Sequence, residues 1–241
     1  ISLGTQSQWA WHSIPSARDY TLQDVVRPYA SCDGTEAPYA IQHNEGLAGE
    51  ATQALRANPH RLHLGLVGLV IRKENGEEVA LSDLANVHQQ LDLWTGRIES
   101  NYTIEGTPVK VVVYSHPLDD RLGVQITSPL IAKDRLKVKF TFPYGKECHV
   151  CPGYDWSQHD RQRSVLTRQG MNQGSIKRQL DTTLYFTHIS WQKEGTLQAM
   201  PLPHHFLLTP AATHDTFEFD VLFSRDSTAH AVAFNDTKDN S

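Results

Sequence analysis

Short segments with the character of β-strands recur along almost the entire chain, and this pattern limits its possible folds more than any other feature. Runs rich in Val, Ile, Thr, Phe and Tyr alternate with turn residues, while long stretches with the 3.6-residue period of an amphipathic helix are nearly absent. About ten strands predict an all-β protein that buries its apolar faces between two large packed sheets. The predicted strands are Leu62–Arg72, Val79–Leu81, Leu91–Tyr102, Thr107–Ser115, Gly123–Ser128, Lys137–Phe142, Gln179–Ser190, Leu197–Ala199, His205–Thr209 and Thr216–Ser224.

Turn residues and one helical segment interrupt this pattern. Glu105-Gly106 and Asn75-Gly76 each separate two strand-like runs, and both predict solvent-exposed hairpin turns. One short helix is predicted over Leu47–Arg56, whose apolar residues recur at helical spacing and which Pro59 brings to an end. A weaker helical turn is predicted at Ser82–Val87.

Two stretches lack a regular pattern. Pro143–Asn172 combines Cys, Pro, Gly and Trp with many polar residues, and we interpret it as a long excursion from the sheet, of a kind that is usually functional or covered. Residues 235–241 are polar and acidic, which is typical of a tail or the start of a linker. Because no composition shift marks a boundary before them, residues 1–234 are expected to form one sandwich domain.

The charge balance and the length of the apolar runs disfavour two classes of partner. Lys and Arg total 22 against 27 Asp and Glu, and the basic residues form no stripe that would neutralise phosphates, so nucleic-acid binding is not expected. The longest apolar run, Leu62–Ile71, is far shorter than the roughly twenty residues that a membrane span requires. No membrane association is therefore expected.

The chain opens with Ile1 rather than Met, so we expect that its N-terminus was processed or truncated. Two Asn-x-Thr sequons begin at Asn101 and Asn235, and both are glycan acceptors if the chain passes through a secretory pathway. These features together favour a secreted glycoprotein.

The segment from Trp9 to Ser13 is the first candidate binding region. On a strand, Trp9 and Trp11 would share one face, with His12 following on the other. Two exposed indoles would form a platform on which sugar rings stack, whereas two buried ones would close one end of a sandwich core. The sequence leaves both interpretations open.

A second candidate region contains His60, Arg61 and His63. His60 and His63 lie on opposite faces of an extended chain, so a shared metal is not expected there. Imidazoles satisfied by backbone groups at a strand start are one interpretation of these residues. The other is a row of polar rings along a cleft, suited to recognition of hydroxyl groups.

Cys148 and Cys151 have the Cys-x-x-Cys spacing, which fits a local disulfide, two free thiols or half of a zinc site. No second ligand pair accompanies them, and no βαβ pattern supports a redox motif. Phosphate-binding glycine loops are also absent, so no cofactor is expected. Ser190 and Lys193 match a Ser-x-x-Lys spacing, but neither companion motif is present.

Ten carboxylates are candidates for the acid and base pair that hydrolysis of a glycosidic bond needs, but sequence alone does not say which of them converge. They are Asp92, Glu99, Asp119, Asp120, Asp155, Asp160, Asp181, Asp215, Glu218 and Asp220.

Taken together, several spaced motifs give the chain a resemblance, over most of residues 6–225, to a known domain. It resembles the N-terminal β-supersandwich domain of six-hairpin glycosidase-like ((α/α)6) carbohydrate-active enzymes. Phe217–Ser224 is similar to the last strand of that sandwich. The motifs are Gln8-Trp9-Ala10-Trp11-His12-Ser13, Ala57-Asn58-Pro59-His60-Arg61-Leu62-His63-Leu64-Gly65, Gln89-Gln90-Leu91-Asp92-Leu93-Trp94-Thr95-Gly96 and Phe142-Pro143-Tyr144-Gly145.

This resemblance implies a sandwich whose loops help to wall a carbohydrate cleft, while the catalytic carboxylates lie mainly in a helical toroid. No helical barrel follows within the 241 residues, so no catalytic residue can be assigned. The leading hypothesis is a cleft-forming part of a secreted glycoside hydrolase-like enzyme, with an α-helical catalytic domain or subunit as partner. Substrate binding is then expected at Trp9, Trp11, His12, His60 and Arg61.

Two other hypotheses stay open. One is a free-standing polysaccharide lyase or hydrolase that uses His and Tyr, or paired carboxylates, in the sandwich groove. The other is a protein-interaction module that docks through a large sheet face.

Overall fold

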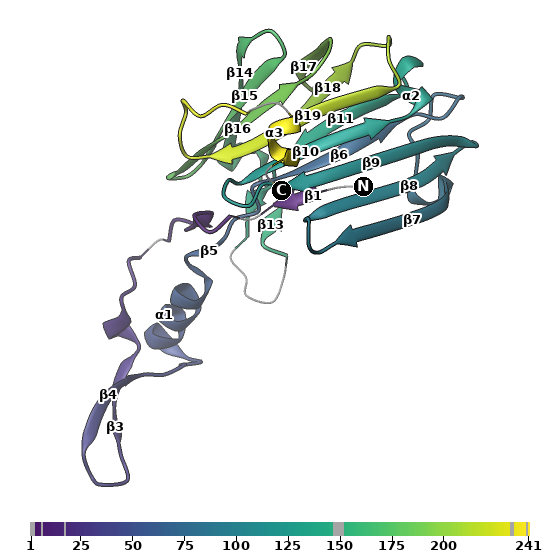
Figure 1. Cartoon of the computed structure of the whole chain (residues 1–241). Coiled ribbons are helices and arrows are strands. Elements are labelled where there is room, and N and C mark those ends of the chain that lie inside the picture. The colour runs from purple at the N-terminus through teal and green to yellow at the C-terminus, as the bar shows by residue number, and fades with distance from the viewer. Residues whose placement is uncertain (1–2, 6, 17, 147–151, 232–233, 240) are drawn as a thin grey trace.

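The computed structural model describes residues 3–5, 7–16, 18–146, 152–231, 234–239 and 241, and it shows a two-layer β-sandwich from which an arm projects (Figure 1). All the strand pairings within the two layers are antiparallel. The five-stranded layer has the order β1 (Leu3–Thr5), β6 (Gly65–Ile71), β11 (Leu136–Thr141), β18 (His205–Pro210) and β17 (Gly195–Ala199). The eight-stranded layer has the order β14 (Gln162–Gly170), β15 (Gln173–Leu180), β16 (Thr183–Trp191), β19 (Thr216–Ser224), β10 (Arg121–Thr127), β9 (Thr107–Ser115), β8 (Arg97–Ile104) and β7 (Leu84–Asp92). The predicted all-β, two-sheet fold is thus confirmed.

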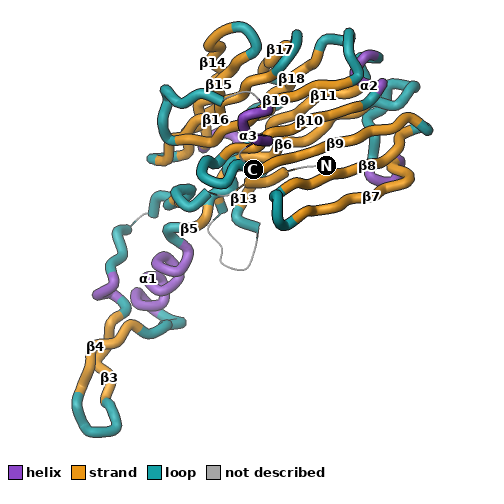
Figure 2. The backbone as a smooth tube through the Cα atoms, in the orientation of Figure 1, coloured by secondary structure: helices purple, strands orange, loops and turns teal. Residues whose placement is uncertain are grey.

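Besides the two layers, the chain forms several smaller elements, some of them in the arm (Figure 2). Three short ladders pair β2 (Trp11–His12) with β5 (His60–Arg61), β3 (Val26–Ala30) with β4 (Glu36–Ala40), and β12 (Tyr144–Gly145) with β13 (Tyr154–Asp155). The helices are α1 (Gly46–Ala57), α2 (Pro129–Ala132) and α3 (Phe234–Asp239), with 3-10 turns η1 (Leu22–Asp24), η2 (Leu81–Asp83) and η3 (His159–Arg161). Among the described residues, none of these helices has the length and apolar character that crossing a membrane requires.

The core lies between the two sheets and is built from the alternation of side chains along each strand. On β19, Phe217, Phe219 and Val221 are buried at every second position. Phe140 of β11 in the opposite sheet meets Phe219 edge to face, with ring centroids 6.2 Å apart. This contact joins the two layers near their centre.

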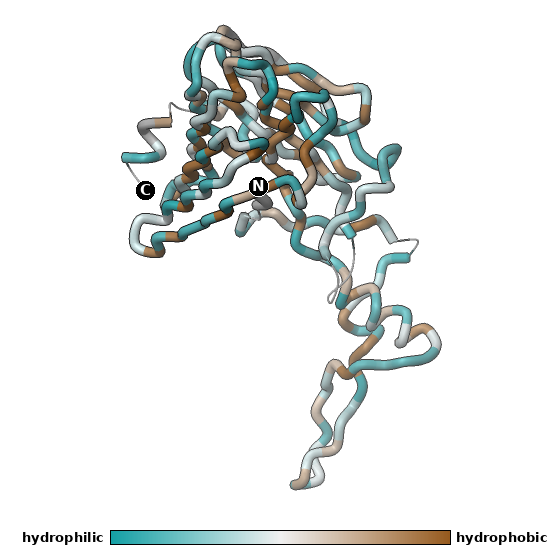
Figure 3. Tube along the Cα trace, turned by 90° about the vertical axis from the view of Figure 1, so that its right-hand side faces the viewer, coloured by the Kyte–Doolittle hydropathy of each residue, from teal (hydrophilic) through white to brown (hydrophobic). Residues whose placement is uncertain are grey.

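Residues 13–59 form the arm, which projects from the sandwich in Figure 1 and in the view turned by 90° (Figure 3). It contains η1, the β3–β4 hairpin and α1, which confirms the helix predicted over Leu47–Arg56. The helix ends at Ala57, and a cis peptide bond joins Asn58 to Pro59. Within the arm Val25, Ala51 and Thr52 are buried, whereas the hairpin is exposed along almost its whole length.

The predicted tail at residues 235–241 contains most of α3, which packs on the outer face of the eight-stranded sheet. Glycine at position 123 of β10 lets the helix approach, because a Cβ there would lie 3.1 Å from atoms of both Phe234 and Thr237. The Thr237 hydroxyl donates a hydrogen bond to Asp220, whose carboxylate is fully buried beneath the helix. A buried carboxylate needs such a donor, so this contact holds the helix to the sheet.

Two predicted strands are wrong because each contains a turn. The segment predicted as one strand from Leu91 to Tyr102 divides into β7 and β8 at residues 93–96, where the Asp92 carboxylate accepts a hydrogen bond from the Trp94 backbone N–H (2.9 Å). This Asx-type turn is hidden in the sequence by the apolar residues that it exposes. The predicted strand Gln179–Ser190 likewise divides, at Asp181 with its positive φ of 48°.

Further corrections concern short and irregular segments. Leu81 begins η2 rather than ending a strand, and the weak helical turn predicted at Ser82–Val87 is replaced by the end of η2 and the start of β7. The excursion Pro143–Asn172 is more regular than expected, because it contains β12, β13, η3 and β14.

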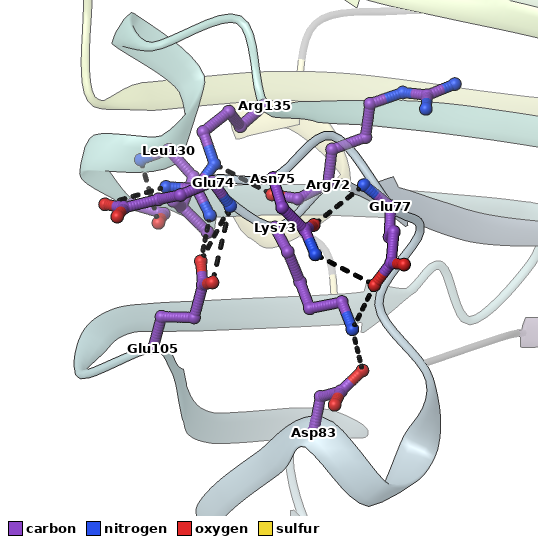
Figure 4. A network of polar contacts seen from close by, with 10 residues as sticks. Arg72, Lys73, Glu74, Asn75, Glu77, Asp83, Glu105, Leu130 and Arg135 are labelled. Atoms are coloured by element: carbon purple, nitrogen blue, oxygen red, sulfur yellow. Dashed lines mark hydrogen bonds and ion pairs between the residues drawn. The ribbon is translucent and has the colours of Figure 1, made fainter.

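The two predicted hairpin turns are exposed and lie side by side at one end of the sandwich (Figure 4). The Glu105 carboxylate accepts a hydrogen bond from the backbone N–H of Glu74 (3.0 Å) and forms an ion pair with Arg135. Lys73 forms an ion pair with Glu77 at 2.9 Å. These mostly exposed charges order the turns but contribute little to the free energy of folding.

We predict that Phe140→Ala lowers the free energy of unfolding by about 3–5 kcal/mol, because it leaves a cavity at the contact between the sheets. Urea denaturation followed by circular dichroism measures this change. The control Leu184→Ala, at an exposed position of β16, is expected to stay within about 0.5 kcal/mol of the unmodified protein. Equal effects of the two substitutions would contradict the assigned core.

Candidate functional site

The candidate site lies where the arm joins the sandwich, at the β2–β5 ladder. In this ladder Trp11 pairs with Arg61, and His12 pairs with His60. Because neighbouring residues of a strand face opposite sides, Trp11 and Arg61 are exposed while His12 and His60 are buried. The structure therefore brings together four of the five residues predicted to bind substrate, but it places them in two different environments.

On the buried side, His12 is the centre of a polar network. Its Nδ1 lies 2.8 Å from the Thr183 hydroxyl, and its Nε2 lies 3.2 Å from the Asp181 carboxylate. The Tyr144 hydroxyl donates a hydrogen bond to the same carboxylate oxygen of Asp181. The network connects the N-terminal segment, β12 and the β15–β16 turn, which are far apart in the sequence.

Aromatic contacts surround the same imidazole. The His60 ring meets His12 edge to face with centroids 5.3 Å apart, and the Tyr144 ring does so at 5.7 Å. Glycine is required at position 145, because a Cβ there would lie 2.7 Å from Nε2 of His60 and 2.9 Å from Cδ2 of His12. This close approach explains the glycine in the motif Phe142-Pro143-Tyr144-Gly145.

Burial determines the charge state of His12. Loss of hydration lowers the pKa of His12 below 6.5, and the neighbouring His60 lowers it further, while the Asp181 carboxylate acts in the opposite direction. Since the net direction is downward, the imidazole is neutral at pH 7. Burial also places His12 and Tyr144 out of reach of a polymeric substrate.

On the exposed side, the Arg61 guanidinium lies 4.4 Å from the centre of the Trp11 ring. Arg61 also donates a hydrogen bond to the backbone carbonyl of Ser7 (2.6 Å), which orients it along the ring. Trp11 retains 44% of its surface in contact with solvent. This pair therefore presents an indole and a cation at the surface.

A second group of rings lies close to this pair, at the segments that contain β5 and β13. Gly153 packs on the backbone of Arg61, where a Cβ would lie 3.2 Å from the carbonyl oxygen. Next to it, Tyr154 lies 5.5 Å from His63 and 5.7 Å from Trp156 between ring centroids, and all three rings are half-buried. We call these residues the aromatic strip: Trp11, Arg61, His63, Tyr154 and Trp156.

Trp9 does not belong to the strip, because it lies in a turn and not on β2. The turn is closed by a hydrogen bond from the Trp11 N–H to the Trp9 carbonyl (2.9 Å), so the two indoles do not follow the alternation of a strand. The Trp9 indole N–H donates to Asp120, and its ring lies 6.1 Å from that of Tyr185 and 5.4 Å from the Arg225 guanidinium. These contacts agree with the core interpretation of Trp9 rather than with an open stacking platform.

Sequence reasoning missed Tyr144, Tyr154 and Trp156, and it did not single out Asp181 from the other carboxylates. Tyr144 lies in one of the spaced motifs, which was the available signal. Tyr154 and Trp156 stand in the segment interpreted as irregular, where the alternating aromatics from Tyr154 to Trp156 are the only hint of a strand.

The other predicted sites are placed as follows. Cys148 and Cys151 lie outside the described residues. Asn101, on β8, donates its amide hydrogen bond to Glu99 (3.0 Å), and this bond and the ion pair with Lys110 contribute to lowering the pKa of Glu99 to about 2. Asn235 lies in α3. No group of three metal-ligating side chains occurs in the part of the chain that the structure describes.

Comparison with known proteins shows a likeness at the level of structure. No family model matches the sequence, and no curated protein matches it. Among solved structures, a protein from the human microbiome assigned as a kojibiose phosphorylase is similar over 74% of this chain, with 15% sequence identity and a TM-score of 0.44. The match covers 24% of the length of that protein. The likeness is coarse and leaves the family of this chain open.

We predict that acidification destabilises the fold below about pH 6.5. Burial lowers the folded-state pKa of His12, His63, His188 and His204, whereas each imidazole binds a proton near pH 6.5 in the unfolded chain. The unfolded state therefore binds more protons, and the free energy of unfolding falls as the pH falls from 7.5 to about 5. Urea denaturation across this range measures the slope, and a flat or rising free energy on acidification would show that the imidazoles are not buried as described. His188→Gln removes one of these imidazoles, so it should reduce the dependence of the free energy of unfolding on pH.

We also predict that Gly145→Ala destabilises the protein by about 1–3 kcal/mol, because the added methyl group presses on two buried imidazoles. Thermal denaturation compares this variant with Lys146→Ala, which alters the exposed neighbouring residue. A Gly145→Ala protein as stable as the Lys146→Ala control would mean that the rings have free space around them.

Proposed function

We propose that this chain is the carbohydrate-binding β-sandwich part of a carbohydrate-active enzyme, and that the aromatic strip contacts the sugar. The observation that carries the proposal is two neighbouring groups of partly exposed rings, the Trp11–Arg61 pair and the His63–Tyr154–Trp156 cluster, which meet where Gly153 packs on the backbone of Arg61. Aromatic faces pack on the C–H faces of sugar rings, and N–H groups of Arg and His bind hydroxyl groups. The resemblance of the sequence motifs to a sandwich that walls a carbohydrate cleft supports the same assignment.

We assign catalysis to an α-helical domain or subunit rather than to this chain. His12 and Tyr144 are the two side chains in the candidate site best suited to proton transfer. Both are buried, and both contact the carboxylate of Asp181. A general acid or base must come within hydrogen-bond reach of the reacting proton. The network therefore supports a structural role, and the alternative of a free-standing lyase or hydrolase gains nothing from it. Secretion and glycans at Asn101 and Asn235 belong to the proposal as well.

We predict that Trp11→Ala and Trp156→Ala each weaken the binding of oligosaccharides about 5- to 150-fold, which corresponds to about 1–3 kcal/mol for a lost stacking contact. Calorimetric titration with a panel of α- and β-linked gluco-, manno- and xylo-oligosaccharides measures this change. Tyr29→Ala is the control, because Tyr29 is an exposed aromatic residue on the arm hairpin and outside the strip. Circular dichroism verifies that each variant is folded.

Two results would overturn the proposal. The first is an unmodified protein that binds none of the oligosaccharides, and the second is a folded Trp11→Ala/Trp156→Ala protein that binds them as tightly as the unmodified one. Turnover of any of these sugars by the isolated chain would instead favour a catalytic sandwich.

A further inference from the structure

Three neighbouring strands of the eight-stranded sheet carry basic side chains and no acidic ones. β14, β15 and β16 follow one another from one edge of this sheet (Figure 1). None of the three contains Asp or Glu, although the whole chain has a formal net charge of -5. Two of their cationic side chains, Arg163 and Lys177, are exposed. Positive charge is therefore concentrated on one part of an otherwise acidic protein.

The strand register brings these two cations to the same face of the sheet. Arg163 lies opposite Gln179, and Val165 lies opposite Lys177. Arg163 and Lys177 are thus diagonal neighbours, about 7–8 Å apart at their backbones. Neither side chain has a hydrogen-bond or ion-pair partner among the residues that the structure describes. Because like charges at this distance repel, an anion that binds between them is stabilised by both.

The side chains around the two cations form a shallow groove. It has a volume of about 260 Å³, and its lining consists of Arg163, Val165, Lys177 and Gln179. On β16, Leu184 lies beside Gln179 and Phe186 lies beside Lys177, so both rows continue with apolar side chains. Val165 is 38% exposed and Leu184 is 41% exposed. We call this region the cationic groove; it combines two cations, one amide and apolar surface.

We propose that the cationic groove binds the acidic group of an anionic saccharide, such as the carboxylate of a uronic acid. The inference rests on the proposed function and names its substrate class. Guanidinium and ammonium groups bind carboxylates through charge-assisted hydrogen bonds. The amide of Gln179 binds hydroxyl groups, and Val165 and Leu184 offer apolar surface to the C–H face of a sugar ring.

The composition of the groove also decides against two other anions. Two cations neutralise one or two negative groups, whereas a nucleic acid requires a basic stripe that this chain lacks. Apolar side chains beside the cations add nothing to the binding of bare phosphate or sulfate, but they match a sugar ring. The volume lies just below the range of about 300–1,000 Å³ that is typical of small-ligand pockets, so the groove suits one sugar residue.

Both strands of the groove lead to the candidate site. Gln179 stands near the end of β15, just before the turn that carries Asp181. Arg163 follows η3, whose Arg161 guanidinium lies 4.6 Å from the centre of the Tyr144 ring. Asp181 and Tyr144 belong to the buried polar network that also underlies one end of the aromatic strip. The groove and the strip are therefore connected to the same rigid part of the sandwich.

Calorimetric titration with two matched sugars tests the groove. The acidic probe is trigalacturonic acid, and the neutral probe is its carboxyl-reduced form. At about 20 mM ionic strength the unmodified protein should bind the acidic probe at least about 5-fold more tightly, since two exposed ion pairs form. This preference should shrink at about 200 mM, because salt screens exposed charges. The double variant Arg163→Gln/Lys177→Gln should lose the preference and bind the neutral probe as the unmodified protein does.

The matched control is Lys133→Gln, which removes an exposed cation at the end of α2 and should keep the preference. Circular dichroism verifies that the variants are folded. Equal affinity of the unmodified protein for the two probes overturns this inference alone, because binding of the neutral probe still supports the proposed function. A preference that survives in the double variant overturns it as well, and so does inorganic phosphate that binds as tightly as the acidic probe. Failure to bind either probe overturns both this inference and the proposed function.

Discussion

The two-residue ladder between β2 and β5 is the constraint on which the site depends. It brings together segments that the whole arm separates, and the alternation of the strands then determines what each side chain can do. His12 and His60 turn inward, where loss of hydration keeps the His12 imidazole neutral, and Trp11 and Arg61 turn outward to solvent. A shift of one residue in this register would bury the indole and expose the imidazoles.

A second buried polar group, the Arg178 side chain, holds part of the excursion Pro143–Asn172 in place. Arg178 of β15 is completely buried, and it donates hydrogen bonds to the side chains of Gln162 and Ser164 (2.6 Å each) and to the Pro143 carbonyl (3.2 Å). Its guanidinium also lies 4.9 Å from the centre of the Phe142 ring. A buried cation is costly without such partners. Arg178 therefore ties Pro143, at the start of the excursion, to the first residues of β14, and β13 with its aromatic residues lies between these two points in the sequence.

Sequence reasoning succeeded where the signal is local. The bounds of β9 and β19 agree with the predicted strands to the residue, because alternation of apolar residues and clear turn residues mark both ends. The β7–β8 turn was missed because it contains the apolar residues Leu93 and Trp94. Hydropathy alone does not distinguish a turn of this composition from a strand. The candidate site depends instead on long-range pairs, such as His12 with Asp181 and Thr183. Nothing in the local pattern around either residue indicates its partner.

The β2–β5 ladder and the hydrogen bond between Asn58 and Ile14 hold the base of the arm. The chain enters the arm just after His12 and leaves it just before His60, and the Asn58 side chain holds the backbone of Ile14 immediately beyond the ladder (3.0 Å). Both connections of the arm thus pass through one narrow junction at the β2–β5 ladder. A force applied to the arm would therefore reach the sandwich through the strand pair that carries Trp11 and Arg61.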